Sequence, residues 1–339
     1  MSIREAIATI VNDHHDLSEN EAFDAMHEVF RGEATPAQLG ALLIALRMKG
    51  ESVDEIVGLA KAMREHSLHV QVDGPLLDTC GTGGDGQGTF NVSTAAAFVA
   101  AGAGARIAKH GNRAMTSGCG SADLLEALGA KIDLSPQQVA ECIERTGFGF
   151  MFAQAFHPAM KHAAGPRREL GVRTAFNILG PLTNPARAQH QLLGVASPEI
   201  APKIAAALQR LSGGHALVVH GHDGVDELSI SSASLVCEVS GEGAREYSIS
   251  PEDAGLPFRP AEAIRGGSPQ QNAAVLISVL EGERGPIRDV VVLNAGGALH
   301  AGDAAPGVKE GARMAEDAID SGAAIQRLEA WVQLTQSFA

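Results

Sequence analysis

From residue 76 onward, short apolar runs alternate with glycine-rich or polar loops and with helix-start signals, and no other feature limits the fold as strongly. Strands that alternate with helices are typical of α/β domains with a mostly parallel sheet. We interpret five apolar runs as strands, at residues 76–77, 105–108, 148–152, 216–219 and 290–293. Residues 235–249 differ, because two strand-like runs flank Gly241-Glu242-Gly243 and predict a hairpin.

The segment before residue 73 carries helix signals and no strand pattern. Capping signals mark helix starts, and leucines at helical spacing give one of these helices an apolar face. The starts are Ser18-Glu19-Asn20-Glu21, Thr35-Pro36-Ala37-Gln38 and Ser52-Val53-Asp54-Glu55. We therefore predict a small helical domain at residues 1–72 and a larger α/β domain at residues 73–339. Loop residues near 166–190 predict a segment that returns to the helical domain.

The chain is acidic, with a formal net charge of −14 over 339 residues. Nucleic acids and anionic membranes reward basic surfaces, so we expect neither as a main partner. The N-terminus lacks the apolar run of a signal peptide. The cysteines are widely spaced and form no CxxC pair, which predicts reduced thiols in a cytoplasmic protein. They are Cys80, Cys119, Cys142 and Cys237.

A glycine-rich loop follows the first apolar run, with the sequence Gly81-Thr82-Gly83-Gly84-Asp85-Gly86. Glycines let the backbone approach an anion and point successive N–H groups at it. Asn91-Val92-Ser93-Thr94 then begins an Ala-rich helix, and a helix N-terminus is a natural phosphate site. A tight turn with a Ser/Thr cap would explain either motif alone. The strand, the loop and the hydroxyl-rich helix start together favour phosphate binding.

The second strand candidate is followed by Lys109-His110-Gly111-Asn112-Arg113, which places two cations, an amide and an imidazole around one glycine. The run Thr116-Ser117-Gly118-Cys119-Gly120-Ser121 comes next, and Asp123 marks a helix start. A solvated surface loop is the simpler interpretation. We favour a second phosphate-binding loop, because so many small residues allow a ligand to approach closely. Cys80 and Cys119 are interpreted as space-filling, since no acid–base partner is identifiable.

Three carboxylates lie in His220-Gly221-His222-Asp223-Gly224-Val225-Asp226-Glu227, directly after a strand candidate. The adjacent Asp226 and Glu227 suit a hard cation such as Mg²⁺, which prefers oxygen ligands. Zinc is disfavoured, because no cysteine or third histidine stands at suitable spacing. A cluster of acids at a helix start remains the alternative to a metal site.

Arg167, Arg168 and Arg173 lie near the expected junction of the two domains. The planar fork of arginine suits a carboxylate ligand, although most arginines form surface ion pairs. Four polar motifs directly follow strand candidates, at the two glycine-rich loops, at the acidic loop and at residues 294–299. Ligands of open α/β sheets bind at the carboxyl ends of strands, so we expect these motifs to converge on one crevice.

The motifs taken in order resemble those of the anthranilate phosphoribosyltransferase family. They are GTGGDGQGTFNVST, AKHGNRAMTSGCGSADLLEALG, FHPAMK, RTAFNILGPLTNPA and HGHDGVDE, and the likeness continues to VVLNAGGAL near the C-terminus. The resemblance implies an α/β fold of the nucleoside phosphorylase/phosphoribosyltransferase type with a small N-terminal helical domain. It also implies a homodimer formed through the helical domain, a site between the domains, and Mg²⁺ as cofactor.

The resemblance also implies which residues bind each substrate and the metal ion. Phosphoribosyl pyrophosphate would be bound by Gly81, Gly84, Asp85, Thr89, Asn91, Val92, Ser93, Thr94, Lys109, His110, Gly111, Asn112, Arg113, Ala114, Met115, Thr116, Ser117 and Ser121. Anthranilate would lie near Gly81, Asn112 and Arg167, and magnesium would be held by Ser93, Asp226 and Glu227. No covalent or dedicated acid–base residue is implied.

Two segments depart from the family pattern. Residues 114–121 read Ala-Met-Thr-Ser-Gly-Cys-Gly-Ser, where the family more often has Ser-Val-Ser-Ser-Lys-Ser-Gly-Ser. A lysine is therefore missing at Gly118, and the phosphate charge must be met elsewhere. Gly165-Pro166 stands where Pro-Val is commoner, just before Arg167.

The expected reaction joins the amine of anthranilate to the ribose-5-phosphate part of phosphoribosyl pyrophosphate, with pyrophosphate as leaving group. Metal ions and fixed N–H dipoles would stabilise the negative charge that develops on it. A nucleoside phosphorylase of similar fold is one alternative, and a non-enzymatic nucleic-acid-binding relative is another. The acidic loop and the Lys109–Arg113 loop favour the transferase over the first, and the net charge argues against the second.

Overall fold

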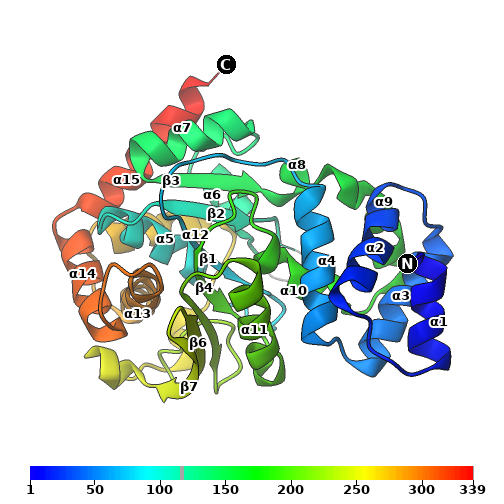
Figure 1. Cartoon of the computed structure of the whole chain (residues 1–339). Helices are drawn as coiled ribbons and strands as arrows, with labels where there is room; N and C mark the ends of the chain where they lie inside the picture. Colours follow the sequence, from blue (N-terminus) through cyan, green and yellow to red (C-terminus); the bar gives the residue numbers. More distant parts are fainter. Residues whose placement is uncertain (115–117, 339) are drawn as a thin grey trace.

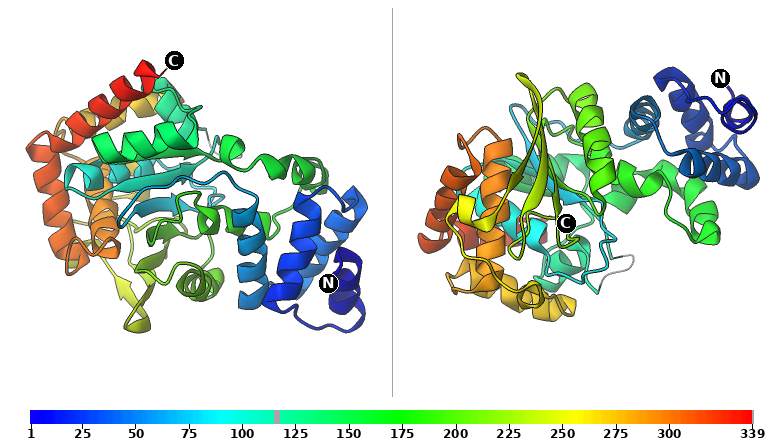
Figure 2. Two further views of the ribbon diagram at one scale, coloured as in Figure 1. Left: turned by 45° about the horizontal axis from the view of Figure 1, so that its top comes forward. Right: turned by 90° about the horizontal axis from the view of Figure 1, so that it is seen from below.

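The computed structural model describes residues 1–114 and 118–338 of the chain. The N-terminal helices form a small helical domain at one end of the molecule, and α9 packs against them (Figure 1). These helices are α1 (Ile3–Asn12), α2 (Glu19–Phe30), α3 (Pro36–Lys49), α4 (Val53–Glu65) and the returning α9 (Lys161–Leu170). The two views in Figure 2 show this domain attached beside the sheet of the larger domain, with the N-terminus on its outer side.

The predicted capping boxes are confirmed, because each cap makes its reciprocal hydrogen bonds. The side chains of Ser18, Thr35 and Ser52 each accept a hydrogen bond from the backbone N–H three residues on. Gly50 ends α3 with a φ of 85°, a left-handed conformation that glycine adopts without strain. Local sequence signals therefore set the ends of these helices.

The larger domain is built on one seven-stranded sheet in the order β3-β2-β1-β4-β5-β6-β7. The first five strands along the chain are parallel, and β6 and β7 form an antiparallel hairpin at the edge, as residues 235–249 predicted. The strands are β1 (Leu77–Gly81), β2 (Ile107–Gly111), β3 (Phe148–Phe152), β4 (His190–Gly194), β5 (Ala216–Gly221), β6 (Ser234–Ser240) and β7 (Gly243–Ile249). The expected fold class, a helical domain plus an α/β domain with a mostly parallel sheet, is confirmed.

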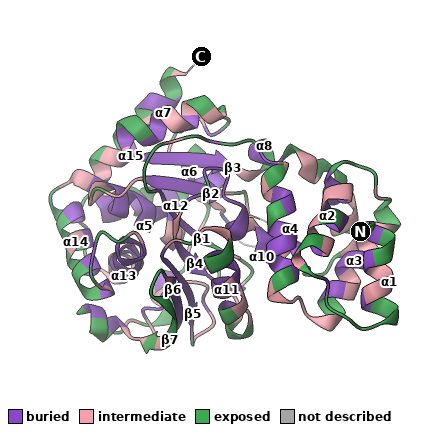
Figure 3. Cartoon of the chain, viewed as in Figure 1, coloured by how far each residue is buried: buried purple, intermediate pink, exposed green. Residues whose placement is uncertain are grey.

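Helices cover both faces of the sheet, and successive residues of the central strands point to opposite sides. Leu192 and Leu217 pack with α5 and α13, whereas Leu193 and Val218 share a core with α11 and the helical domain. Figure 3 shows the buried strands and the buried lengths of α5 and α13. The remaining helices are α5 (Val92–Gly102), α6 (Ser121–Ala127), α7 (Pro136–Thr146), α8 (Ala153–Phe156), α10 (Phe176–Leu179), α11 (Ala201–Leu211), α12 (Pro269–Leu280), α13 (Pro286–Ala301), α14 (Val308–Asp320) and α15 (Ala323–Ser337).

Two sequence interpretations are corrected by this topology. Residues 290–293 are not a strand, because they lie inside the helix α13, whose core-facing length is buried on nearly every side. The strand β4 (His190–Gly194) was missed, although it lies at the centre of the sheet between β1 and β5. An apolar run of four residues fits a buried helix and a buried strand equally well, so periodicity could not separate the two.

Within the described residues, no helix is long and apolar enough to cross a membrane. The four cysteines are all buried and free.

Candidate active site

The loops after β1 and β5 meet at the carboxyl edge of the sheet, and Asp226 joins them. Its Oδ2 accepts a hydrogen bond of 2.8 Å from the backbone N–H of Gly83. A Cβ at Gly81 would lie 2.6 Å from the same oxygen, and one at Gly194 would lie 1.6 Å from the Asp226 carbonyl. Only glycine fits at these two positions, because the acidic loop packs directly on the ends of β1 and β4.

Glu227 reaches the first turn of α5, which begins after the glycine-rich loop. Its Oε1 accepts a hydrogen bond of 3.2 Å from the backbone N–H of Ser93. The Ser93 hydroxyl lies 3.3 Å from the Lys109 ammonium, and the Ser93 carbonyl accepts from the Thr79 hydroxyl at 2.8 Å. The three motifs after β1, β2 and β5 are thus linked around one helix N-terminus.

Three carboxylates lie at this edge of the sheet and repel one another, namely those of Asp85, Asp226 and Glu227. Burial, and next the negative charge of Asp85, raise the pKa of Asp226 to about 7. Burial and the charge of Asp226 also raise the pKa of Glu227 well above its usual range. Asp85 Oδ2 is buried and has no hydrogen-bond partner among the described residues. Asp85, Asp226 and Glu227 supply hard oxygen donors, which suit a Mg²⁺ ion, and the charge of such an ion would relieve this repulsion.

Lys109 lies under the glycine-rich loop and is almost fully buried. Its ammonium donates hydrogen bonds to the carbonyl and hydroxyl oxygens of Thr79, and burial lowers its pKa. Among the neighbouring charges, the buried carboxylate of Asp78 raises the pKa of Lys109 most, and burial raises the pKa of that carboxyl to about 6. Asn184 and the backbone N–H of His110 also donate to Asp78, at 2.8 and 3.2 Å. Lys109 therefore places a buried positive charge next to the Ser93 hydroxyl in the first turn of α5.

The second glycine-containing loop is closed by Asp123 at the start of α6. The backbone N–H groups of Ala114 and Gly120 donate to Asp123 Oδ2 at 3.0 and 2.9 Å. A Cβ at Gly120 would lie 2.3 Å from the Ala114 nitrogen, so only glycine allows this close approach. The expected ligands Met115, Thr116 and Ser117 lie outside the described residues.

Arg113 and Asn112 differ in how strongly other residues hold them. The Arg113 guanidinium is paired with Asp123 and Glu126 of α6. The Asn112 side chain is exposed, and its oxygen accepts from the Arg113 backbone N–H at 2.8 Å. Its carbonyl accepts from the Ser121 hydroxyl at 3.3 Å. Within residues 1–114 and 118–338, the Asn112 amide nitrogen donates no hydrogen bond, so it can donate one to a ligand.

Asn91 fastens the start of α5 to the second loop. Its side-chain nitrogen donates to the Cys119 carbonyl at 3.0 Å, and its oxygen accepts from Asn272 at 2.9 Å.

Thr89 forms an isolated bridge with Arg265. Val92 and Thr94 are buried in the first turn of α5, and the half-buried Gly111 ends β2. These residues shape the loops, and sequence reasoning had no signal for the part played by Asn272.

The arginines near the domain junction take different positions. Arg173 donates to the carbonyls of Gly84 and Gly83 at 2.8 and 3.0 Å and so anchors the glycine-rich loop. Arg167 lies on α9 with its guanidinium 4.9 Å from the centre of the Phe176 ring. Among the described residues, no carboxylate pairs with Arg167, and burial lowers its pKa. Arg167 can therefore bind a carboxylate that comes from outside the chain.

Asn294 positions the acidic loop, a role that the sequence analysis missed. Its amide donates to the Leu228 carbonyl and accepts from the Leu228 N–H, both at 2.9 Å, directly after Glu227. A Cβ at Gly297 would lie 2.7 Å from the Leu228 side chain. The motif at residues 294–299 was expected to contact a ligand after a strand. It is instead a buried helical segment that supports the acidic loop.

His110 and His157 form a buried pair beside the second loop. His110 Nδ1 lies 3.2 Å from the Gly180 carbonyl, and its Nε2 lies 3.2 Å from His157 Nε2. His157 Nδ1 has no partner among the described residues. One proton on each ring satisfies both contacts, so both imidazoles are neutral. Burial lowers the pKa of His110 to about 4 and that of His157 to about 3.

This pair should make the protein sensitive to acid. Both folded-state pKa values lie below the unfolded value of about 6.5, so the stabilisation is complete above that pH and is lost as pH falls toward 4. We expect a loss on the order of 2 kcal/mol per histidine between about pH 6.5 and about pH 4.5, measured by urea denaturation. In His157→Gln the amide can still donate to His110, and the loss should be about halved. An equal loss in both proteins would contradict the assignment.

Two family models match the chain. The helical bundle domain of a glycosyl transferase family matches residues 4–67, and the a/b domain of that family matches residues 73–325. Anthranilate phosphoribosyltransferase from Chloroflexus aurantiacus is 56% identical over 99% of both chains. The enzyme of that name from Moorella thermoacetica is 52% identical over 99% of both chains.

Solved structures agree with these sequence matches. The anthranilate phosphoribosyltransferase of Thermus thermophilus has a TM-score of 0.93 at 48% identity, over 99% of both chains. The Saccharomyces cerevisiae enzyme in complex with PRPP and Mg has a TM-score of 0.91 at 31% identity, over 99% of this chain and 98% of that one.

Proposed function

The chain belongs to the anthranilate phosphoribosyltransferase family, and from this premise we propose how its residues carry out the reaction. The enzyme transfers the 5-phosphoribosyl group of phosphoribosyl pyrophosphate to the amine of anthranilate, in tryptophan biosynthesis. The products are N-(5-phosphoribosyl)anthranilate and pyrophosphate. Mg²⁺ is its cofactor. This assignment of roles rests on one observation. At the edge of the sheet, Asp226 of the acidic loop accepts a hydrogen bond from Gly83 of the glycine-rich loop.

The glycine-rich loop and the first turn of α5 bind the pyrophosphate and ribose phosphate groups through backbone N–H groups and hydroxyls. Asp226 and Glu227, with Ser93, would hold Mg²⁺, which would offset the negative charge of the pyrophosphate. Arg173 keeps Gly83 and Gly84 in place for this contact.

The amine of anthranilate is neutral and already carries a lone pair, so its attack needs no strong base. The chain's task is to orient the amine and to stabilise charge on the leaving group. We assign anthranilate to the region of Gly81, Asn112 and Arg167. Asn112 supplies a hydrogen bond, and Arg167 supplies the counter-charge for the carboxylate.

Anthranilate fluorescence provides the direct test of this function. The purified protein should consume anthranilate only when phosphoribosyl pyrophosphate and Mg²⁺ are both present, with release of one pyrophosphate per anthranilate. Phosphorolysis of a nucleoside by inorganic phosphate, without turnover of anthranilate, would instead identify a nucleoside phosphorylase. Binding of nucleic acid without either reaction would identify the non-enzymatic alternative.

Arg167→Ala should weaken the use of anthranilate more than the use of phosphoribosyl pyrophosphate. A charge-assisted contact contributes about 1.5–3 kcal/mol, so kcat/KM for anthranilate should fall roughly tenfold to a hundredfold. Arg168→Ala is the matched control, because Arg168 is exposed on the same helix and should change neither constant. Asn112→Ala should show the same substrate preference as Arg167→Ala. Equal losses for both substrates would contradict the assignment.

We propose that the protein is a homodimer formed through the helical domain. An apolar cavity of about 750 Å³ lies between α3 and α9, and its lining includes Val11, Ile44 and Leu170. Met48 beside it is 83% exposed, which is unusual for so large an apolar side chain. A second copy of the same face would cover these residues.

Met48→Asp should raise the dimer dissociation constant at least about tenfold in analytical ultracentrifugation, because a charge replaces a buried apolar contact. Phe258→Asp is the control, since Phe258 is also exposed but lies in the α/β domain. A wild-type monomer, or equal effects of both changes, would refute this interface. We also place the enzyme in the cytoplasm, consistent with four buried free thiols.

A further inference from the structure

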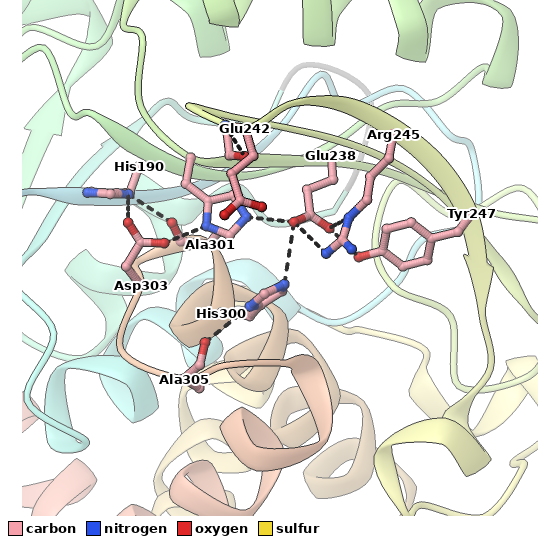
Figure 4. Close-up of polar contacts among 11 residues, drawn as sticks. His190, Glu238, Glu242, Arg245, Tyr247, His300, Ala301, Asp303 and Ala305 are labelled. Atoms are coloured by element: carbon pink, nitrogen blue, oxygen red, sulfur yellow. Dashed lines mark hydrogen bonds and ion pairs between the residues drawn. The ribbon is translucent and has the colours of Figure 1, made fainter.

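A second cluster of potential metal ligands lies at the other end of β5. His215 precedes β5. Glu238 lies on β6 and His300 in the last turn of α13, and Figure 4 labels both. All three are buried, and their ligand atoms lie within 4.8 Å of one another. Glu227 follows the opposite end of β5, and a strand of six residues spans about 20 Å. This cluster is therefore separate from the active site.

Both histidines present Nε2 to the same carboxylate oxygen. His215 Nε2 lies 3.1 Å and His300 Nε2 lies 3.6 Å from Glu238 Oε1. Ligand atoms around a tetrahedral zinc ion with bonds of about 2.0–2.1 Å are about 3.3 Å apart. The spacing is thus close to that of a metal site with two imidazoles and one carboxylate.

The opposite ring nitrogens are already committed as donors. His300 Nδ1 lies 3.1 Å from the Ala305 carbonyl, and His215 Nδ1 lies 2.6 Å from Asp303 Oδ1. Metal-binding histidines usually have such an acceptor on the second nitrogen. The Asp303 backbone has a φ of 55°, which is rare for a residue other than glycine, and its side chain contacts His215 in this conformation.

A neutral imidazole with its proton on Nδ1 points the lone pair of Nε2 at Glu238. Two lone pairs facing one carboxylate oxygen repel it, so the arrangement requires protons or a metal cation between these atoms. We propose that His215, Glu238 and His300 form a transition-metal site, with Zn²⁺ as the preferred ion, that ties the end of α13 to the β6–β7 hairpin. Imidazole nitrogen is a ligand that Zn²⁺ accepts and Mg²⁺ disfavours.

Arg245 competes with the proposed ion for Glu238. Its guanidinium donates to both carboxylate oxygens, at 3.0 and 2.8 Å, and the Tyr247 hydroxyl donates to Oε2 at 2.7 Å. The Arg245 side chain is 65% exposed, so it can move away when an ion binds Oε1. A cavity of about 300 Å³, lined by Arg245, Tyr247 and His300, gives access and room for a water as fourth ligand.

Cobalt(II) provides a spectroscopic test that does not depend on activity. The full-length protein is freed of metals, supplied with excess Mg²⁺ to fill the active site, and titrated with Co²⁺ and then Zn²⁺. We expect one Co²⁺ per chain with the intense visible bands of a tetrahedral site, and stoichiometric loss of these bands when Zn²⁺ is added.

Three variants identify the ligands. His300→Gln should abolish the visible bands, and Asp303→Asn should weaken affinity about tenfold to a hundredfold because it only supports His215. Arg245→Gln should bind the metal more tightly than the wild type, because a competing cation is removed. His14→Gln with His15→Gln is the control, since these adjacent histidines are exposed at the N-terminus and could bind metal adventitiously. This control should leave the stoichiometry unchanged.

The proposal fails if neither the wild type nor Arg245→Gln gives tetrahedral Co²⁺ bands, since protons would then hold the cluster together. It also fails if the signal survives His300→Gln or disappears in the His14/His15 control. Because Arg245→Gln alters an exposed side chain, it keeps the test decisive even if His300→Gln folds poorly.

Discussion

Asp226→Asn combined with Glu227→Gln should lower kcat/KM by at least about a thousandfold while leaving the melting temperature unchanged or higher. The reason is geometric. Both carboxylates lie where the glycine-rich loop and the first turn of α5 meet, and both bind backbone N–H groups there. The amide oxygens of Asn and Gln can accept the same two hydrogen bonds, so the loop keeps its support. The charges needed to hold Mg²⁺ are lost.

Stability separates this interpretation from a purely structural role. The two acids repel each other and Asp85, so removing their charge should not destabilise the metal-free protein. If the acids served only to stabilise the helix N-terminus through their negative charge, the double variant would melt earlier yet keep its Mg²⁺-dependent turnover. Calorimetry with and without Mg²⁺, together with the fluorescence assay, measures both quantities. Near-normal turnover with unchanged Mg²⁺ dependence would refute the metal assignment.

Asp223→Asn is the matched control in the same loop. Its Oδ2 accepts hydrogen bonds from the hydroxyls of Ser229 and Ser231, so it holds the loop together internally. We expect this change to lower the melting temperature while the Mg²⁺ concentration needed for half-maximal rate stays constant. This outcome would assign one carboxylate of the acidic loop to folding and two to the cofactor.

Lys109→Met should impair the use of phosphoribosyl pyrophosphate about a hundredfold, with a milder effect on anthranilate, and should also destabilise the fold. The ammonium is buried, donates to Thr79 and contacts the Ser93 hydroxyl at the helix start where we propose that phosphate binds. Removing it leaves Asp78 as a buried, uncompensated charge. Loss of this neighbouring positive charge destabilises the buried carboxylate. Steady-state kinetics and urea denaturation measure the two effects.

The double variant Asp78→Asn with Lys109→Met separates the two roles of the lysine. The asparagine side chain carries no charge, so most of the lost stability should return. The weak use of phosphoribosyl pyrophosphate should persist, because the positive charge near Ser93 is still missing. If the double variant recovers both stability and substrate use, Lys109 is only structural.

Much of this architecture is determined by local sequence, because the signals act over a few residues. A capping box joins a side chain to a backbone N–H three residues on, so Ser18, Thr35 and Ser52 predicted their helices correctly. The glycine-rich loop, the helix start at Asn91 and the acidic pair could likewise be found from residue types, because phosphate and Mg²⁺ binding demand particular chemistry. Their roles toward each ligand remain predictions.

Tertiary structure alone decided the features that depend on contacts between distant segments. Residues 290–293 could be a strand or a helix by pattern, and only packing against the sheet and α14 makes them part of α13. Arg173 reaches Gly83 across 90 residues of chain, and Asn294 reaches Leu228 across 66. His215, Glu238 and His300 meet only because the start of β5 lies beside the ends of β6 and α13. The spacing of residues along the sequence does not predict these contacts, since they depend on how the whole chain packs.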